Sequence, residues 1–209
     1  KLMQRLPDYD YIISLQASFM DLAIIYKKDI FDFKAHTELF SDNDYNFAGR
    51  PPLQVDFSIK SNEGDIPISI INLHMKCCDS GLNRRKKASL MLYDYIKKNN
   101  YNSSNLIVLG DWNDDTKDEA GHHCFDPFLN DEKYYFVTEE ISKDISQASY
   151  PKEPYVSFLD HILISQTFLP KGSKYKVETI RLGDYMGGFE VYESYISDHR
   201  PVFLSFPIY

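Results

Sequence analysis

Runs of β-forming apolar residues recur along this chain, with short polar segments between them. From Leu53 to Ile59 every second residue is apolar, so these side chains fall on one face of a predicted strand over residues 53–60. A turn sequence at residues 62–65 separates this strand from a continuous apolar run at residues 66–74. The two strands are therefore predicted to pair as a hairpin.

Further strands follow at irregular intervals, and helices are few. The run at residues 105–109 is apolar throughout, which is typical of a strand buried on both faces. The best helix candidate spans about residues 84–98, with Leu90, Leu92, Tyr93 and Ile96 as its apolar positions. This pattern favours an α+β protein with two packed sheets over a doubly wound parallel sheet. The remaining predicted strands are residues 9–15, 22–26, 158–164, 176–181 and 202–206.

Size and charge narrow the classes of protein further. The chain has 209 residues, and we expect residues 1–209 to form one domain, since domains usually contain ~100–200 residues. Lys and Arg total 23 against 31 Asp and Glu, a formal charge of −8, which excludes a generally cationic surface but not a local basic patch. No apolar run approaches the ~18 residues that cross a bilayer. No signal peptide is visible, but the chain opens on Lys1, so its compartment is left open.

The three cysteines, Cys77, Cys78 and Cys124, do not form a disulfide framework. A disulfide between the neighbours Cys77 and Cys78 would be strained. A single disulfide between Cys124 and one of these two neighbours remains an alternative. We expect free thiols.

Polar and ionisable residues stand beside apolar strands at four places, as expected if the strand ends build a site. In the first, Asp111 and Asn113 follow the strand at residues 105–109. A carboxylate can orient or deprotonate water, and a carboxamide can donate to a phosphoryl oxygen. The alternative is a tight turn, because Gly, Asp and Asn are turn formers.

The other three places each have a functional and a structural interpretation. Asn72 and His74 would project to the same side of their strand, where His74 could protonate a leaving oxygen or serve as a structural hydrogen bonder. Asp160 could hold a histidine in one tautomer or cap a strand. Asp198 and His199 offer a metal ligand and a phosphate contact, or form a polar loop ended by proline. Together these residues suit metal-assisted phosphoester hydrolysis, with Mg²⁺ or Mn²⁺ preferred over zinc.

Four segments, NLHMK, IVLGDWND, SFLDHIL and SDHRPV, occur in the order found in the endonuclease/exonuclease/phosphatase superfamily, the deoxyribonuclease-I-like hydrolases. The chain resembles this family over about residues 21–206, and AGRPPLQVDF at residues 48–57 is similar to its bacterial nuclease-like members. The resemblance implies a four-layer αββα sandwich of two packed mixed β-sheets flanked by helices. The site would lie at one edge of the sheets and use one or two divalent metals for in-line attack of water.

The resemblance also implies residue roles. Asp111 would activate the water, and Asn113 would contact the phosphate. His199 would stabilise the phosphoryl charge with Asp160 as its partner, and His74 would assist on the phosphate or leaving-group side. The remaining assignments are Asp198 as a metal-associated carboxylate and Arg50, Asn72 and Arg84 as substrate-binding residues.

One departure from the family concerns its first two motifs, a strand ending in Asn and a segment with a metal-ligand Glu. No Glu occurs before Glu38, so we expect the chain to be N-terminally incomplete, to bind metal poorly and to lose much activity. The missing strand would expose a sheet edge that a homo-oligomer could cover.

The substrate is predicted to be nucleic acid, which the GRPP segment and the basic run at residues 84–87 favour. That basic run could equally be a solvated first helical turn. A phosphatase acting on a phosphorylated small molecule, or a phospholipid phosphodiesterase, is the nearest alternative. An inactive fragment or binding module is the alternative of another class.

Overall fold

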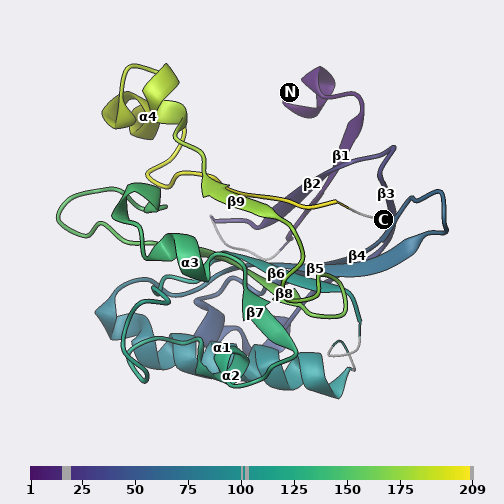
Figure 1. Ribbon diagram of the computed structural model, residues 1–209, viewed down its shortest axis with the longest axis horizontal. Helices are drawn as coiled ribbons and strands as arrows, with labels where there is room; N and C mark the ends of the chain where they lie inside the picture. Colours follow the sequence, from purple (N-terminus) through teal and green to yellow (C-terminus); the bar gives the residue numbers. More distant parts are fainter. Residues whose placement is uncertain (16–19, 100, 102–103, 208–209) are drawn as a thin grey trace.

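The computed structural model describes residues 1–15, 20–99, 101 and 104–207. Its centre is a six-stranded mixed sheet with the strand order β3-β4-β5-β6-β8-β7 (Figure 1). β4 and β5 are antiparallel, with Leu53 opposite Asn72 and Ile59 opposite Ile66, which confirms the predicted hairpin. The strands of this sheet are β3 (Phe31–Glu38), β4 (Leu53–Ile59), β5 (Ile66–His74), β6 (Leu106–Asp111), β7 (Tyr134–Phe136) and β8 (Asp160–Ser165).

Helices α1 (Leu82–Lys98) and α2 (Asp126–Leu129) lie along one face of this sheet (Figure 1). α1 joins β5 to β6, which are parallel, and buries Ala88, Leu92 and Ile96 at helical spacing. The predicted apolar position Leu90 is wrong, since this side chain is 51% exposed. At 3.6 residues per turn, Leu90 lies on roughly the opposite side of the helix from Leu92.

The opposite face of the sheet is covered by two small antiparallel sheets (Figure 1). β1 (Tyr9–Ile13) pairs with β2 (Ala23–Lys27), and β9 (Lys176–Thr179) pairs with β10 (Val202–Ser205). Their inward side chains, including Ile12, Ile24, Val177 and Leu204, pack on one apolar cluster with Val55, Phe57 and Ile107 of the large sheet. The expected α+β sandwich is thus confirmed, and within the described residues its second β layer is two separate sheets.

Two strands of the large sheet were not predicted. In β3 the residues Phe31, Phe33 and Ala35 alternate with polar residues, but this alternation is short and most of the strand is exposed. β7 contains only three residues. Among the described residues, no helix is both long and apolar enough to cross a membrane. The other helices are α3 (Glu139–Ser142), α4 (Phe189–Tyr195) and 3₁₀ turns at Met3–Arg5, Ser41–Asn43, Tyr45–Phe47, Asp79–Gly81, Ile145–Gln147 and Leu182–Tyr185.

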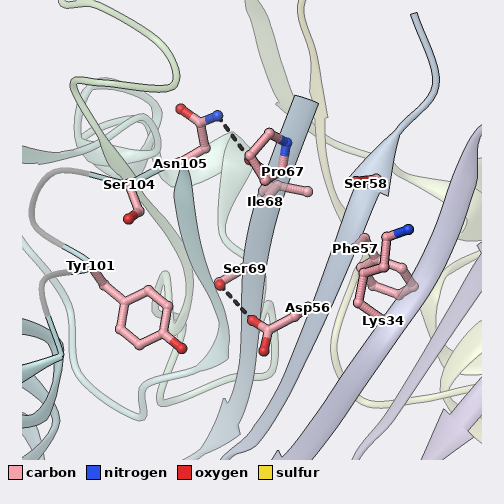
Figure 2. Close-up of a pocket in the computed structure, with 10 residues that line it drawn as sticks. All are labelled: Lys34, Asp56, Phe57, Ser58, Pro67, Ile68, Ser69, Tyr101, Ser104 and Asn105. Carbon is pink, nitrogen blue, oxygen red and sulfur yellow. Dashed lines mark hydrogen bonds between the residues drawn. The ribbon is translucent and has the colours of Figure 1, made fainter. Parts of the chain in front are cut away.

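A pocket opens at the end of the large sheet where β5 and β6 begin (Figure 2). On its wall the Ser69 hydroxyl donates to the Asp56 carboxylate at 2.5 Å, and Tyr101 and Lys34 lie beside them. The pocket contains none of the predicted site residues. Those on β5 and β6 stand at the opposite ends of the two strands.

Candidate active site

Three of the predicted residues form a row across the large sheet. His74 at the end of β5 is the direct partner of Asp111 at the end of β6, and Asp111 is the direct partner of Asp160 at the start of β8. Direct partners point to the same face of a sheet. Trp112, the next residue, is fully buried on the α1 side, so the row faces the small sheets.

His199 joins this row from the loop that precedes β10. Its Nδ1 lies 2.7 Å from Asp160 Oδ2, and the Tyr192 hydroxyl donates to its backbone carbonyl at 2.8 Å. Within the described residues, Asp111, Asp160 and His199 are the group whose ligand atoms all lie within 4.8 Å of one another. The fold therefore brings together side chains that are up to 88 positions apart in the sequence, from Asp111 to His199.

Asn113 holds Asp111 in place. Its backbone N–H donates to Asp111 Oδ1 at 2.9 Å, and its side-chain amide donates to Asp111 Oδ2 at 2.9 Å and to the Met75 carbonyl at 3.1 Å. The residue adopts φ 54°, a left-handed conformation that Asn tolerates better than most residues. The tight turn and the functional interpretation of this segment are thus compatible.

The charges in the row depend on one another. Burial lowers the pKa of His199, but the hydrogen bond that His199 donates to the Asp160 carboxylate and the charges of Asp160, Asp111 and Asp198 outweigh it and raise the pKa to about 9. Burial and the Asp160 charge raise the pKa of Asp111 to about 7. At neutral pH His199 is therefore a cation, and Asp111 is poised to exchange a proton.

His74 behaves in the opposite way. Its Nε2 lies 3.3 Å from Asp111 Oδ2, yet burial and the charges of Arg50 and His199 lower its pKa to about 4. The Arg50 side chain donates to the carbonyls of His74 at 3.0 Å and Met75 at 2.7 Å. Arg50 therefore holds the end of β5 and the start of the following loop in place beside His74.

Not every predicted residue reaches the row. Asn72 projects to the same side of β5 as His74, as expected, and donates to the Ala23 carbonyl at 3.0 Å. The Arg84 guanidinium lies 4.1 Å from the centre of the Tyr45 ring and donates to the Tyr45 carbonyl. Asp198 is exposed and lies outside the Asp111–Asp160–His199 group.

Arg85 is the one residue of the basic run at residues 84–87 that fits neither interpretation, because it is buried. Its side chain is only 5% exposed and forms a 2.6 Å ion pair with Asp114, which is equally buried. Its Nη1 also donates to the carbonyls of Lys76 and Cys78, at 2.9 and 2.8 Å. The buried Arg85 guanidinium therefore joins α1 to Asp114 and to the loop after β5, and it is not available to solvent or to a phosphate.

Ser149 is a positioning residue that sequence reasoning missed. Its fully buried hydroxyl accepts from the backbone N–H groups of Leu159 and Asp160, at 2.9 and 3.1 Å. Its carbonyl accepts from the N–H of Arg200 at 2.7 Å. Ser149 thus links the start of β8, which carries Asp160, to the loop that carries His199, but it lies in a polar segment with no pattern to reveal it.

Comparison with known proteins extends this picture. No family model matches the sequence, and no curated protein sequence matches it. Several solved structures are similar over 98–99% of this chain, among them these three. TDP2 from D. rerio, solved with a single-strand DNA product, is 16% identical, is covered over 80% of its chain and has a TM-score of 0.61. An endonuclease/exonuclease/phosphatase family protein from Bacteroides thetaiotaomicron is 18% identical, is covered over 79% of its chain and has a TM-score of 0.59. A mannosyl-6-phosphatase from the same organism is 18% identical, is covered over 80% of its chain and has a TM-score of 0.58.

At these identities the likeness concerns the backbone, and it spans nearly the whole chain. In each of the three solved structures, about a fifth of the chain lies outside the matched part. The expectation from the sequence motifs is met: this chain has the fold of the endonuclease/exonuclease/phosphatase superfamily.

Proposed function

We propose that this chain is a divalent-metal-dependent phosphoester hydrolase that cleaves the phosphodiester bonds of nucleic acid. One observation carries the proposal. His74, Asp111 and Asp160 are direct partners across β5, β6 and β8, and His199 meets Asp160 at 2.7 Å from the loop that precedes β10. A cation, two carboxylates and a neutral imidazole on one sheet face are the groups that phosphoester hydrolysis needs.

The donor set fits Mg²⁺ or Mn²⁺. The carboxylates of Asp111 and Asp160 stand side by side, and Mg²⁺ is commonly held by one or two carboxylates together with substrate phosphate oxygens. Asp111 and Asp160 would therefore hold the ion, and exposed Asp198 is the further acidic candidate. The bound ion would neutralise phosphate charge and make water more acidic.

The protein's own residues divide the remaining work. Asp111 orients the attacking water and accepts its proton, while Asn113 keeps the Asp111 carboxylate in place. Protonated His199 donates to a phosphoryl oxygen from the ring nitrogen that does not face Asp160. Neutral His74 donates or accepts a hydrogen bond on the leaving-group side.

Two observations bear on the substrate. The TDP2 neighbour was solved with a single-strand DNA product, which supports nucleic acid. The mannosyl-6-phosphatase neighbour supports a phosphorylated small molecule instead. The basic run favours nucleic acid less than its sequence suggests, because Arg84, Arg85 and Lys86 bond to groups of the chain itself. A nuclease is therefore the first proposal, and a phosphomonoesterase is the second.

The test compares a diester with a monoester. Supercoiled plasmid and a sugar phosphate are incubated with the protein and Mg²⁺ or Mn²⁺, with and without EDTA. We expect metal-dependent plasmid nicking that falls by about 10²–10⁴-fold in Asp111→Asn and His199→Ala. Asp126→Asn and His122→Ala, which change the same residue types outside the row, are the matched controls and should keep full activity.

Each other outcome has a definite meaning. Phosphate release from the sugar phosphate without nicking would favour the phosphatase. No hydrolysis of either substrate, together with no Mn²⁺ binding in a calorimetric titration of the folded chain, would support the inactive binding module. Equal activity losses in the matched controls would contradict the position of the site.

A further inference from the structure

Two adjacent cysteines, Cys77 and Cys78, lie in the loop between β5 and α1, three and four residues after His74. Their sulfur atoms are 2.9 Å apart, with the Cys78 thiol donating to Cys77 Sγ. Cys78 is exposed and Cys77 is half-buried, so reagents can reach the pair. Cys124 is buried and has no part in this contact.

The backbone at Cys78 is strained. Its φ of 69° and ψ of 165° fall in a region that essentially only glycine adopts without cost. The Cys78 carbonyl accepts hydrogen bonds from Arg85 Nη1 at 2.8 Å and from the Gly81 N–H at 2.8 Å, and these bonds keep the residue in this conformation. Such strain persists where surrounding groups impose it, and it is concentrated at functional positions.

The two thiols also differ chemically. The hydrogen bond from Cys78 lowers the pKa of Cys77, and the Lys76 ammonium, 3.4 Å from Cys77 Sγ, and the Arg50 charge act in the same direction. The same contact raises the pKa of Cys78. Cys77 is therefore the better thiolate, and the thiolate is the form that attacks disulfides.

We propose that Cys77 and Cys78 form a reversible thiol-oxidation site, which a low-molecular-weight disulfide converts into a disulfide between the two neighbours. The proposal rests on the sulfur contact, the strained backbone and the exposure of the pair. Its effect on catalysis rests in addition on the proposed function.

The reaction is two successive thiol–disulfide exchanges. Cys77 Sγ attacks one sulfur of the disulfide R–S–S–R, whose S–S bond breaks, and the leaving thiolate takes up the proton that Cys77 lost. Cys78 Sγ then loses its proton, attacks Cys77 Sγ and expels the second R–S⁻, which takes up that proton. Two cysteine thiols are oxidised and one disulfide is reduced to two thiols.

The loop that carries the pair is connected to the candidate active site. The Met75 carbonyl accepts from Arg50 Nη2 at 2.7 Å and from the Asn113 amide at 3.1 Å. The Lys76 carbonyl accepts from Arg85. Closing a ring at Cys77–Cys78 changes the backbone torsions next to these carbonyls, so oxidation weakens the bonds that hold Arg50 and Asn113.

The chemical test uses glutathione disulfide as the probe. Trypsin cleaves after Lys76 and Arg84 and releases residues 77–84, which contain both neighbouring cysteines and not Cys124. After treatment and alkylation we expect this peptide to be unalkylated and lighter than its reduced form by two hydrogen atoms. Dithiothreitol should reverse the change, and Cys124→Ala should not affect it.

Three results would overturn the proposal: both cysteines alkylated, a stable mixed disulfide with glutathione on one of them, or a bond to Cys124 or to a second copy. Cys77→Ser and Cys78→Ser provide the complementary controls. Each should remain folded by circular dichroism and should stop at the mixed disulfide.

The link to the site is tested separately. In ¹⁵N NMR spectra the Arg50 Nε–H and Asn113 side-chain signals should shift on oxidation of the wild type and not of Cys77→Ser. If the chain hydrolyses a phosphoester, its rate should fall about tenfold, the effect of losing one hydrogen bond to a charged group. Unchanged signals would refute the link even if no substrate is cleaved, which separates this failure from failure of the proposed function.

Discussion

His199 and Asp160 form the shortest side-chain contact in the row. Their ring nitrogen and carboxylate oxygen are 2.7 Å apart, and their side chains are only 24% and 23% exposed. A charge-assisted hydrogen bond in such partly buried surroundings is stronger than one in water. The pair therefore determines both the charge of His199 and its orientation toward the row.

Replacing Asp160 by Asn should lower the pKa of His199 from about 9 toward or below its ordinary value, because the opposing charge is removed and burial remains. The raised pKa stabilises the fold fully below about pH 6.5, and this contribution is lost as the pH rises through about 9. The variant should thus lose on the order of 2 kcal/mol at pH 6 and much less at pH 10. NMR titration of the imidazole and urea unfolding at both pH values check this.

A constant difference in unfolding free energy between pH 6 and pH 10 would contradict this account. Asp94→Asn is the control, since Asp94 is an exposed residue of α1, outside the row. Its unfolding free energy should follow the wild type across the same range.

Among the elements, β5 and β6 approach each other most tightly at Gly110, next to the site. A Cβ at this position would overlap the Leu73 carbonyl oxygen, and the residue has φ +133°. Gly64, in the turn between β4 and β5, has a similar φ of +121° but nothing within 4 Å of its Cβ position. The two positions separate the cost of the torsion from the cost of the close approach.

Gly64→Ala should cost about 1–3 kcal/mol through backbone strain alone. Gly110→Ala should cost about 2 kcal/mol more, because β5 must move away from β6, and it should also displace Asp111 and lower phosphoesterase activity. Chemical denaturation and the plasmid assay measure both effects. Equal losses at the two glycines would show that the strands tolerate the added methyl group.

The start of α1 is fixed by a buried ion pair. Replacing Arg85 by Met leaves the Asp114 carboxylate buried without its cation and frees the Lys76 and Cys78 carbonyls. We expect a loss of about 3–5 kcal/mol in unfolding free energy. Arg84→Met, one residue earlier, loses only a contact with the Tyr45 ring and its carbonyl and should cost less than about 1 kcal/mol. Similar losses from the two substitutions would refute this difference.

At the scale of the whole molecule, the two β layers differ in the number of paired strands and in the elements that pack against them. The large sheet has six paired strands and a helix layer, whereas β1–β2 and β9–β10 are separate pairs. On the outer face of β1–β2 the partners Tyr11 and Ile25 remain 48% and 47% exposed. Isolated two-stranded sheets are marginally stable, so the stability of β1–β2 and β9–β10 depends on the packing of their inner faces against the large sheet.

Hydrogen exchange should reflect this difference. We expect amides of β1–β2 and β9–β10 to exchange faster than those in the centre of β5 and β6, because the small sheets open locally without global unfolding. Mass spectrometry of peptides from the four regions measures the rates. Equal protection across both layers would mean that the molecule opens as a single cooperative unit.

The sequence predicted much of the local structure. The hairpin of β4 and β5 followed from alternation and a turn, and α1 was predicted over most of its length. β3 was missed although residues 31–36 alternate apolar and polar, because this alternation is short and ends in three polar residues. Leu90 was misplaced because apolar character alone does not specify the buried stripe of a helix. These are the errors expected where burial depends on partners that are distant in sequence.

The sequence by itself determined which chemical groups are present: Asp, Asn and His in four short motifs, and the superfamily they resemble. Only the tertiary structure decided which of them meet. Strand register aligned His74, Asp111 and Asp160, and packing between sheets brought in His199, while Arg84 and Asp198 lie outside the group. The physical reason is that register, burial and charge coupling arise between segments far apart along the chain, and no local pattern encodes them.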